Sequence, residues 1–268
     1  AKDIQSAGSI ASGSWTGIRS VRGNNFPDLA FSNNDIPHRV VGLLGYRIEY
    51  GGRFGGATQI SLGYVGTQSA RINYTYNGDM NRDGINGNDL IYVPTADELA
   101  NGAIKFEQFN QTYRDANNVQ QTKTFTIADQ QAAYEKFIQD DPYLNSRRGQ
   151  YAERNGKLLP WLHQIDLSAV QEVFIYTGKK RNTIQLRADI LNFGNLLNSD
   201  WGVGYRLRAT SPLGYRSINS NNEPVFRMVT YTPDASTNVP DLLSDNLVKR
   251  ETPFDVWTMQ FGIRYIFE

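Results

Sequence analysis

Residues 77–94, NGDMNRDGINGNDLIYVP, place acidic and amide side chains at alternate positions around a glycine. This spacing is typical of calcium-binding loops, in which side-chain oxygens at positions 1, 3 and 5 precede a glycine at position 6 and a backbone carbonyl at position 7. The acid expected at position 12 is absent, because Leu90 stands there and the nearest acid is one residue earlier. The candidate ligands for a Ca²⁺ ion are Asp79, Asn81, Asp83, Ile85 and Asp89.

The same residues also fit a purely structural role. Asp, Asn and Gly all favour turns, because their short side chains bond nearby backbone groups or tolerate unusual dihedral angles. The preceding RINYTYNG is typical of a strand rather than of the helix that opens an EF-hand. A calcium site and a turn that caps a strand therefore remain alternatives.

Other kinds of chemistry find little support in the composition. The chain has no cysteine and only two histidines, His38 and His163, so thiolate sites and His-rich metal centres are excluded. Neither histidine accompanies a nucleophile motif, and we predict no catalytic site. The 27 basic and 27 acidic residues balance, which leaves no excess charge for nucleic acid as a partner.

Alternation of apolar and polar residues is the main structural signal. In the last segment, DVWTMQFGIRYIFE, one parity is almost entirely apolar and the other holds Thr258, Gln260, Gly262 and Arg264. Period two predicts a strand with one apolar face, and its length is sufficient to cross a bilayer at a tilt. We expect these residues to face lipid: Trp257, Met259, Phe261, Ile263, Tyr265 and Phe267.

The same pattern recurs in RVVGLLGYRIEY, in the run through Ile60, Leu62 and Tyr64, in HQIDLSAVQEVFIY and in NTIQLRADILNF. We expect the second run to continue through Ile72, Tyr74 and Tyr76. Weaker candidates at residues 202–209 and 225–231 bring the expected number of strands to seven. The parity opposite the apolar one predicts a set of lumen-facing residues: Arg47, Glu49, Asp166, Glu172, Arg187, Asp189 and Arg264.

The connections alternate between short turns, in GGRFGG and TGKKRN, and long segments. Short turns on one side and long loops on the other are typical of transmembrane antiparallel β-barrels. We therefore divide the all-β chain into an extracellular loop or strand end (1–37), barrel strands with a short periplasmic turn (38–76), a long extracellular loop with a short helix near residues 127–144 (77–160), and barrel strands ending in a C-terminal outer-membrane signal (161–268). An odd number of strands favours the C-terminal part of a larger barrel.

Four segments in order, NNDIPHRVV, GDMNRDGINGNDLIYVP, ADILNFGNLLNSDWG and MQFGIRYIF, resemble the C-terminal barrel of TonB-dependent outer-membrane receptors of the Bacteroidetes, in particular the Oar-like group with a carboxypeptidase-regulatory-like domain. The resemblance implies a large barrel of about 22 strands in the bacterial outer membrane. It also implies a plug domain, energy supplied through TonB, uptake of a large or scarce substrate, and a lipoprotein or other protein partner at the extracellular loops.

Two other functions remain open from the sequence. The chain could form a self-contained small outer-membrane barrel that acts as an adhesin or structural protein, which requires an eighth strand in residues 1–37. It could instead be a soluble, secreted β-sandwich that binds carbohydrate and uses calcium at residues 79–89.

Overall fold

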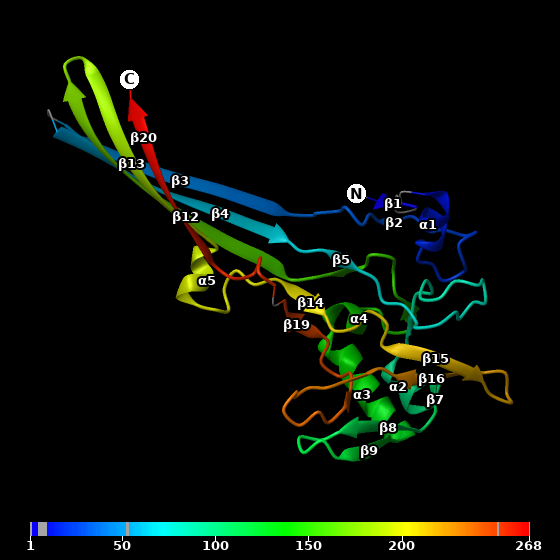
Figure 1. Ribbon diagram of the computed structural model, residues 1–268. Helices are drawn as coiled ribbons and strands as arrows, with labels where there is room; N and C mark the ends of the chain where they lie inside the picture. The colour runs from blue at the N-terminus through cyan, green and yellow to red at the C-terminus, as the bar shows by residue number, and fades with distance from the viewer. Residues whose placement is uncertain (1, 5–9, 52–53, 251, 268) are drawn as a thin grey trace. The chain divides into compact units, whose positions relative to one another are not determined.

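The computed structural model describes residues 2–4, 10–51, 54–250 and 252–267, and most of its regular elements are strands (Figure 1). The chain divides into two compact units. Unit 1 comprises Ala1–Asp35, Ala70–Leu158 and Leu207–Val248, and unit 2 comprises Ile36–Ser69, Leu159–Arg206 and Lys249–Glu268. No helix of the described residues is long and apolar enough to cross a membrane.

Unit 2 is built on one five-stranded antiparallel sheet. Its strands, in the order in which they pair, are β3 (Arg39–Tyr50), β4 (Phe54–Gln68), β12 (Trp161–Thr177), β13 (Lys180–Leu191) and β20 (Thr258–Phe267). Each strand pairs with its neighbours along the chain, so the sheet is a meander in space although long segments separate some of its strands (Figure 1). The five strands with the clearest period-two alternation are the five strands of this sheet.

The short connection between β12 and β13 is a two-residue hairpin, in which Thr177 pairs with Lys180. Gly178 has a φ of 68°, a left-handed conformation that glycine adopts without steric strain. Two residues of the other predicted turn, Gly52 and Arg53, lie outside the described residues. The unit also contains the short helix α5 (Phe193–Leu197), which follows β13.

The sheet is open. Within the described residues, β3 and β20 each pair on one side only, so the five strands do not close into a barrel. The two weaker candidate strands do not join the sheet. Residues 202–209 contain only β14 (Tyr205–Leu207), and residues 225–231 contain β16 (Pro224–Met228) and β17 (Thr230–Tyr231), which pair elsewhere. The prediction of seven wall strands is therefore wrong for this part of the chain.

The predicted continuation of the second strand is also wrong. Strand β4 ends at Gln68, and the side chains of Tyr74 and Tyr76 lie instead in the hydrophobic core of unit 1, where they are 1% and 6% exposed. Alternating tyrosines suit a sheet surface and a buried extended segment equally well, so the pattern could not separate the two.

Most of the predicted long loop, residues 77–158, belongs to unit 1, and the extracellular placement of residues 77–160 stays a prediction. Residues before Asp35 and after Leu207 join the central segment in one folded body with its own core. Its helices are α1 (Ala11–Thr16), α2 (Ala96–Ala100), α3 (Ile127–Asp140) and α4 (Pro142–Ser146). Its strands are β1 (Lys2–Asp3), β2 (Ala30–Phe31), β5 (Arg71–Ile72), β6 (Tyr92–Val93), β7 (Lys105–Phe106), β8 (Phe109–Arg114), β9 (Gln120–Phe125), β10 (Gln150–Tyr151), β11 (Lys157–Leu158), β15 (Leu213–Ile218), β16, β17 and β18 (Asp241–Leu242). The boundary between the units crosses the chain near β14 and β19 (Leu247–Lys249).

The longest helix, α3, confirms the apolar stripe seen in the sequence. Thr126 caps its first turn in a capping box with Asp129, and the stripe buries Tyr134, Phe137 and Ile138. Tyr74 packs edge-on against Phe137, with ring centroids 6.0 Å apart. These contacts stabilise unit 1 by removing large aromatic surfaces from water.

A polar network lies inside this core. Asp141 accepts hydrogen bonds from the Tyr74 hydroxyl at 2.5 Å and from the Lys157 ammonium group at 2.8 Å. Burial raises the pKa of Tyr74 far above its usual value, and the negative charge of Asp141 raises it further. The hydroxyl therefore remains protonated and acts as a donor to the carboxylate.

Candidate functional site

The register of the sheet in unit 2 places the predicted lipid-facing residues on one side. Directly opposed residues of antiparallel strands share a face. The row that contains Phe261 runs through Ala188, Ala169, Ile60 and Tyr46. The next row toward the start of β20 consists of Met259, Ile190, Leu167, Leu62 and Leu44. We call this side the apolar face.

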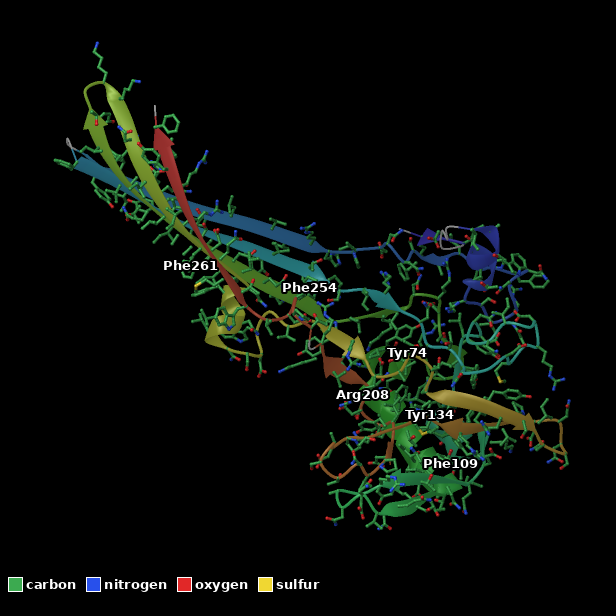
Figure 2. All side chains as sticks on the ribbon, viewed as in Figure 1. Tyr74, Phe109, Tyr134, Arg208, Phe254 and Phe261 are labelled. Atoms are coloured by element: carbon green, nitrogen blue, oxygen red, sulfur yellow. The ribbon has the colours of Figure 1, made fainter. Side chains whose placement is uncertain are left out.

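The apolar face is open over all five strands. Phe261 is 75% exposed and Ile263 is 80% exposed, and Figure 2 labels Phe261 on β20. Tyr265 and Phe267 continue the same face toward the end of the strand. Trp257 lies just before β20, and its backbone N–H donates to Asn195 Oδ1. It therefore flanks the strand and is not one of its residues.

Aromatic rings gather at both ends of the apolar face. At the end where β12 begins, the Trp161 ring stacks with His38 and with His163, and the ring centroids lie 6.2 and 5.8 Å away. The Tyr64 hydroxyl lies 2.8 Å from His163 Nδ1. Tyr50 and Tyr265 lie in one row near the hairpin end of the sheet. The aliphatic rows therefore lie between two groups of amphipathic rings.

The few polar side chains on the apolar face bond one another. Thr58 donates to Gln171 Oε1 at 2.7 Å, and Gln171 Nε2 donates to the Tyr50 hydroxyl at 2.7 Å. The Tyr50 hydroxyl also lies 3.0 Å from Thr58 Oγ1, which closes a triangle of hydrogen bonds. Such mutual pairing reduces the free-energy penalty of removing these groups from water.

The opposite side, which we call the polar face, carries an ionic cluster centred on Glu172. The Glu172 side chain is 10% exposed and accepts from Arg47 at 2.8 Å and from Gln185 Nε2 at 2.9 Å. Arg181 lies 3.4 Å from Glu172 and 3.6 Å from Glu49. These five residues come from strands β3, β12 and β13 and form the Glu172 cluster.

The other predicted lumen-facing residues share the polar face but lie outside this cluster. Arg187 pairs with Asp189 at 2.6 Å on the same strand. Asp166 accepts from the backbone N–H of Asn192 at 2.8 Å, and Arg264 lies opposite Gln185 in the register. The structure thus brings together three of the seven predicted residues and places the other four along the same side of the sheet.

Sequence reasoning missed Arg181, which has the same parity on its strand as Arg187 and Asp189. It also missed Phe174, a buried ring on the polar face over which the Arg181 guanidinium lies at 4.0 Å from the centroid. Gly55 leaves the room for this ring, because a Cβ there would lie 2.4 Å from a Phe174 ring carbon. The parity of Arg181 was a usable signal, whereas the requirement for Gly55 is visible only in three dimensions.

The predicted calcium loop lies in unit 1 and is held by hydrogen bonds from the backbone to side chains. Asp79 accepts from the N–H groups of Asp83 at 3.1 Å and Gly84 at 2.9 Å. Asn81 Oδ1 accepts from the N–H of Asp83, and Asp83 Oδ1 accepts from the N–H of Ile85. Four of the five candidate ligands therefore take part in one turn, whichever of its two roles it has.

The fifth candidate, Asp89, is 3% exposed and reaches back into the loop. Its Oδ2 accepts from the N–H groups of Met80 at 2.7 Å and Asn81 at 3.3 Å. Burial raises the pKa of the Asp89 carboxyl, and the negative charges of Asp83 and Asp79 raise it further, against the effect of these hydrogen bonds. Among the described residues, no three carboxylate or imidazole groups converge closely enough to hold a metal ion by themselves, so an ion here would also need neutral oxygen ligands.

Comparison of the chain with protein-family models, with curated proteins and with solved structures finds no match.

Proposed function

We propose that the sheet of unit 2 is part of the wall of an outer-membrane β-barrel, and that this barrel belongs to a TonB-dependent transporter for a large or scarce substrate. The observation that carries the proposal is the open apolar face across five long strands, with a charged face behind it. The assignment to transport comes from the resemblance of four sequence segments to one receptor family.

Lipid is the occupant that best accounts for the apolar face. Monomeric soluble proteins rarely leave contiguous apolar patches larger than a few hundred Å² in contact with water. The strands contain 10 to 17 residues each, and about 9–11 tilted residues suffice to cross a bilayer. Tyr and Trp are the side chains that favour the interface between lipid and water, and both occur at the ends of the aliphatic rows.

The polar face suits the inside of such a barrel. Carboxylate and guanidinium groups have a large desolvation penalty in hydrocarbon, whereas the lumen of an outer-membrane barrel is polar. Alternation between lipid and lumen along each strand is the pattern expected of these barrels. The Glu172 cluster would then lie on the lumen side, where it can contact the plug domain that the family resemblance implies.

Among the described residues, β3 and β20 each have one unpaired edge, which supports a barrel that includes further strands. An unpaired edge in a membrane exposes backbone N–H and C=O groups to hydrocarbon, which costs several kcal/mol per group. Closure with more strands satisfies them. Under this proposal unit 1 lies outside the membrane, where it contributes to the capture of the substrate or of a protein partner.

A secreted β-sandwich has less support. Such a fold buries its apolar face against a second sheet at about 10 Å. Unit 2 has one sheet of five strands among its described residues, and the large apolar side chains of β3 and β20 are exposed. The small-barrel adhesin remains the second candidate, because it needs the same lipid-facing surface.

The test is the conductance of the natural polypeptide, extracted from outer membranes with detergent and placed in a planar lipid bilayer. A plugged transporter should conduct little until urea on one side loosens the plug, and should then conduct in large, reversible steps. A small filled barrel should show no large steps at any urea concentration that leaves it inserted. That second result would contradict the transporter proposal and favour the adhesin.

A further inference from the structure

Two distant segments of unit 1 meet at the predicted calcium loop. The Ser20 N–H donates to the Asn88 carbonyl at 3.1 Å, and the Leu90 N–H donates to the Ser20 carbonyl at 3.0 Å. Ser20 and Asp89 are partners in an isolated parallel bridge. Asn88 Nδ2 also donates to Asn24 Oδ1 at 3.3 Å. The loop is therefore bounded by residues 20–24 on one side.

The loop carries negative charge without a basic partner. None of the ion pairs formed by the described residues includes Asp79, Asp83 or Asp89. Asp89 is almost fully buried, and an unpaired buried carboxylate has a large desolvation penalty. A bound cation would offset this penalty.

Three buried oxygen atoms of the residues that join these two segments have no hydrogen-bond partner. They are Ser20 Oγ, Asn88 Oδ1 and Asp89 Oδ1, and their residues are 2%, 0% and 3% exposed. Asn88 is attached to the loop through its amide nitrogen, which donates to Asp83 Oδ2 at 3.0 Å. Asp89 is attached through Oδ2, so in both residues the second oxygen remains free beside the acidic loop. An unsatisfied buried oxygen destabilises the fold, because it has lost its hydrogen bonds to water without replacing them.

We propose that the loop of residues 79–89 binds one Ca²⁺ ion. Asp89 and Asn88 supply buried oxygens, Asp83 supplies one loop carboxylate, and Ser20 supplies an oxygen from the second segment. Asp79 shapes the turn, because both of its carboxylate oxygens accept backbone N–H groups. Ca²⁺ takes six to eight oxygen ligands in flexible geometry and accepts carboxylate, amide, hydroxyl and carbonyl oxygens together. Mg²⁺ demands a near-ideal octahedron and keeps several of its waters, which suits a buried set of mixed oxygens less well.

The bound ion would join residues 20–24 to residues 79–89 and so stabilise unit 1 as a whole. The turn and the calcium site are then one structure, because the hydrogen bonds that shape the turn also arrange its oxygens. This inference is independent of the proposed membrane location of the sheet, since all of its residues lie in unit 1.

The test is equilibrium dialysis of the natural polypeptide in detergent against ⁴⁵Ca²⁺, after treatment with EDTA. We expect one ion per chain with a dissociation constant in the range of about 10⁻⁶–10⁻³ M. Asp83→Asn, an exposed change that should not impair folding, should weaken binding by roughly tenfold or more, since ligand charge sets the affinity of such loops. Asp89→Asn should abolish it.

The matched control is Asp115→Asn. Asp115 also accepts two backbone N–H groups in a turn of unit 1, from Asn117 and Val119. This variant should keep the affinity of the parent. Absence of saturable binding at millimolar Ca²⁺, equal loss in Asp83→Asn and Asp115→Asn, or equal binding of Mg²⁺ would each overturn the calcium assignment.

Discussion

The substitution Phe261→Arg offers a quantitative test of the two faces. Phe261 is 75% exposed, and its row lies between the rows of Met259 and Ile263, near the middle of β20. A guanidinium group on the lipid face near the bilayer midplane costs about 2–4 kcal/mol. Loss of the phenyl ring from an apolar environment adds about 1.5–3 kcal/mol. The lower bounds together shift the folding equilibrium by roughly two to three orders of magnitude.

The matched control is Gln260→Arg, one residue earlier and on the polar face. Gln260 lies directly opposite Asp189, so the new positive charge meets an acidic neighbour. Opposite charges at such a position contribute about 0.2–1 kcal/mol of stabilisation. Arginine is a better probe here than aspartate, which would place two carboxylates opposite each other.

The assay is urea unfolding of each variant of the natural polypeptide in lipid vesicles, followed by tryptophan fluorescence, together with its amount in the outer membrane. Phe261→Arg should unfold at much lower urea and assemble poorly, and Gln260→Arg should behave like the parent. Equal stability of the two variants, or greater damage from Gln260→Arg, would refute the assignment of the faces.

Two further predictions concern unit 2. Gly55→Ala should destabilise the sheet by about 1–3 kcal/mol and lower the urea midpoint of unfolding, because its new methyl group would overlap the Phe174 ring. The control is Gly42→Ala, whose Cβ would make ordinary van der Waals contacts and should change the urea midpoint little. The Asp255 carboxylate is held by Arg250, whose hydrogen bonds lower the pKa of Asp255 far below its usual value, although burial opposes this effect. The stabilisation of the fold by the Asp255 carboxylate should be complete at neutral pH and should decline as the pH falls below about 4, the pKa of Asp in the unfolded state. The Asp255→Asn variant should be less stable than the parent at neutral pH and should lose less stability on acidification. If the variant and the parent lose the same stability on acidification, this prediction is wrong.

Alternation predicted the sheet well, because a strand with one apolar face leaves a direct mark on the sequence. The five strands with the strongest alternation are the ones that pair, and the register places the predicted outward residues on one side. The sharing of a face was therefore predictable. The assignment of that face to lipid remains a prediction that the variants above address.

Unit 1 could not be predicted as a folded body from the sequence, because its helices and strands are short and its core joins segments that are distant in sequence. The stripe of α3 was recognised, whereas α2 was missed although Thr95 and Glu98 form a capping box at its start. The alternation of Tyr74 and Tyr76 was misleading, since both rings are buried against side chains from elsewhere in the unit. Tertiary contacts decided these cases, and a single sequence does not reveal such contacts.

The residues of the candidate sites also fall into two groups, those that the sequence could indicate and those that it could not. Charge and parity indicated Glu172 and Arg47, and parity could have indicated Arg181. The unpartnered oxygens of Asn88 and Ser20 could not be predicted, because they follow from the meeting of two segments in space.

The most direct test of the central claim measures which side of β20 contacts lipid. The chain has no cysteine, so single cysteines can replace Phe261, Ile263, Gln260 and Arg264 and carry a nitroxide spin label in outer-membrane vesicles. If the apolar face contacts lipid, labels at 261 and 263 relax faster with oxygen, which concentrates in lipid, and labels at 260 and 264 relax faster with a water-soluble nickel complex. Labels that respond alike at all four positions, or in the reverse order, would show that the apolar face does not contact lipid.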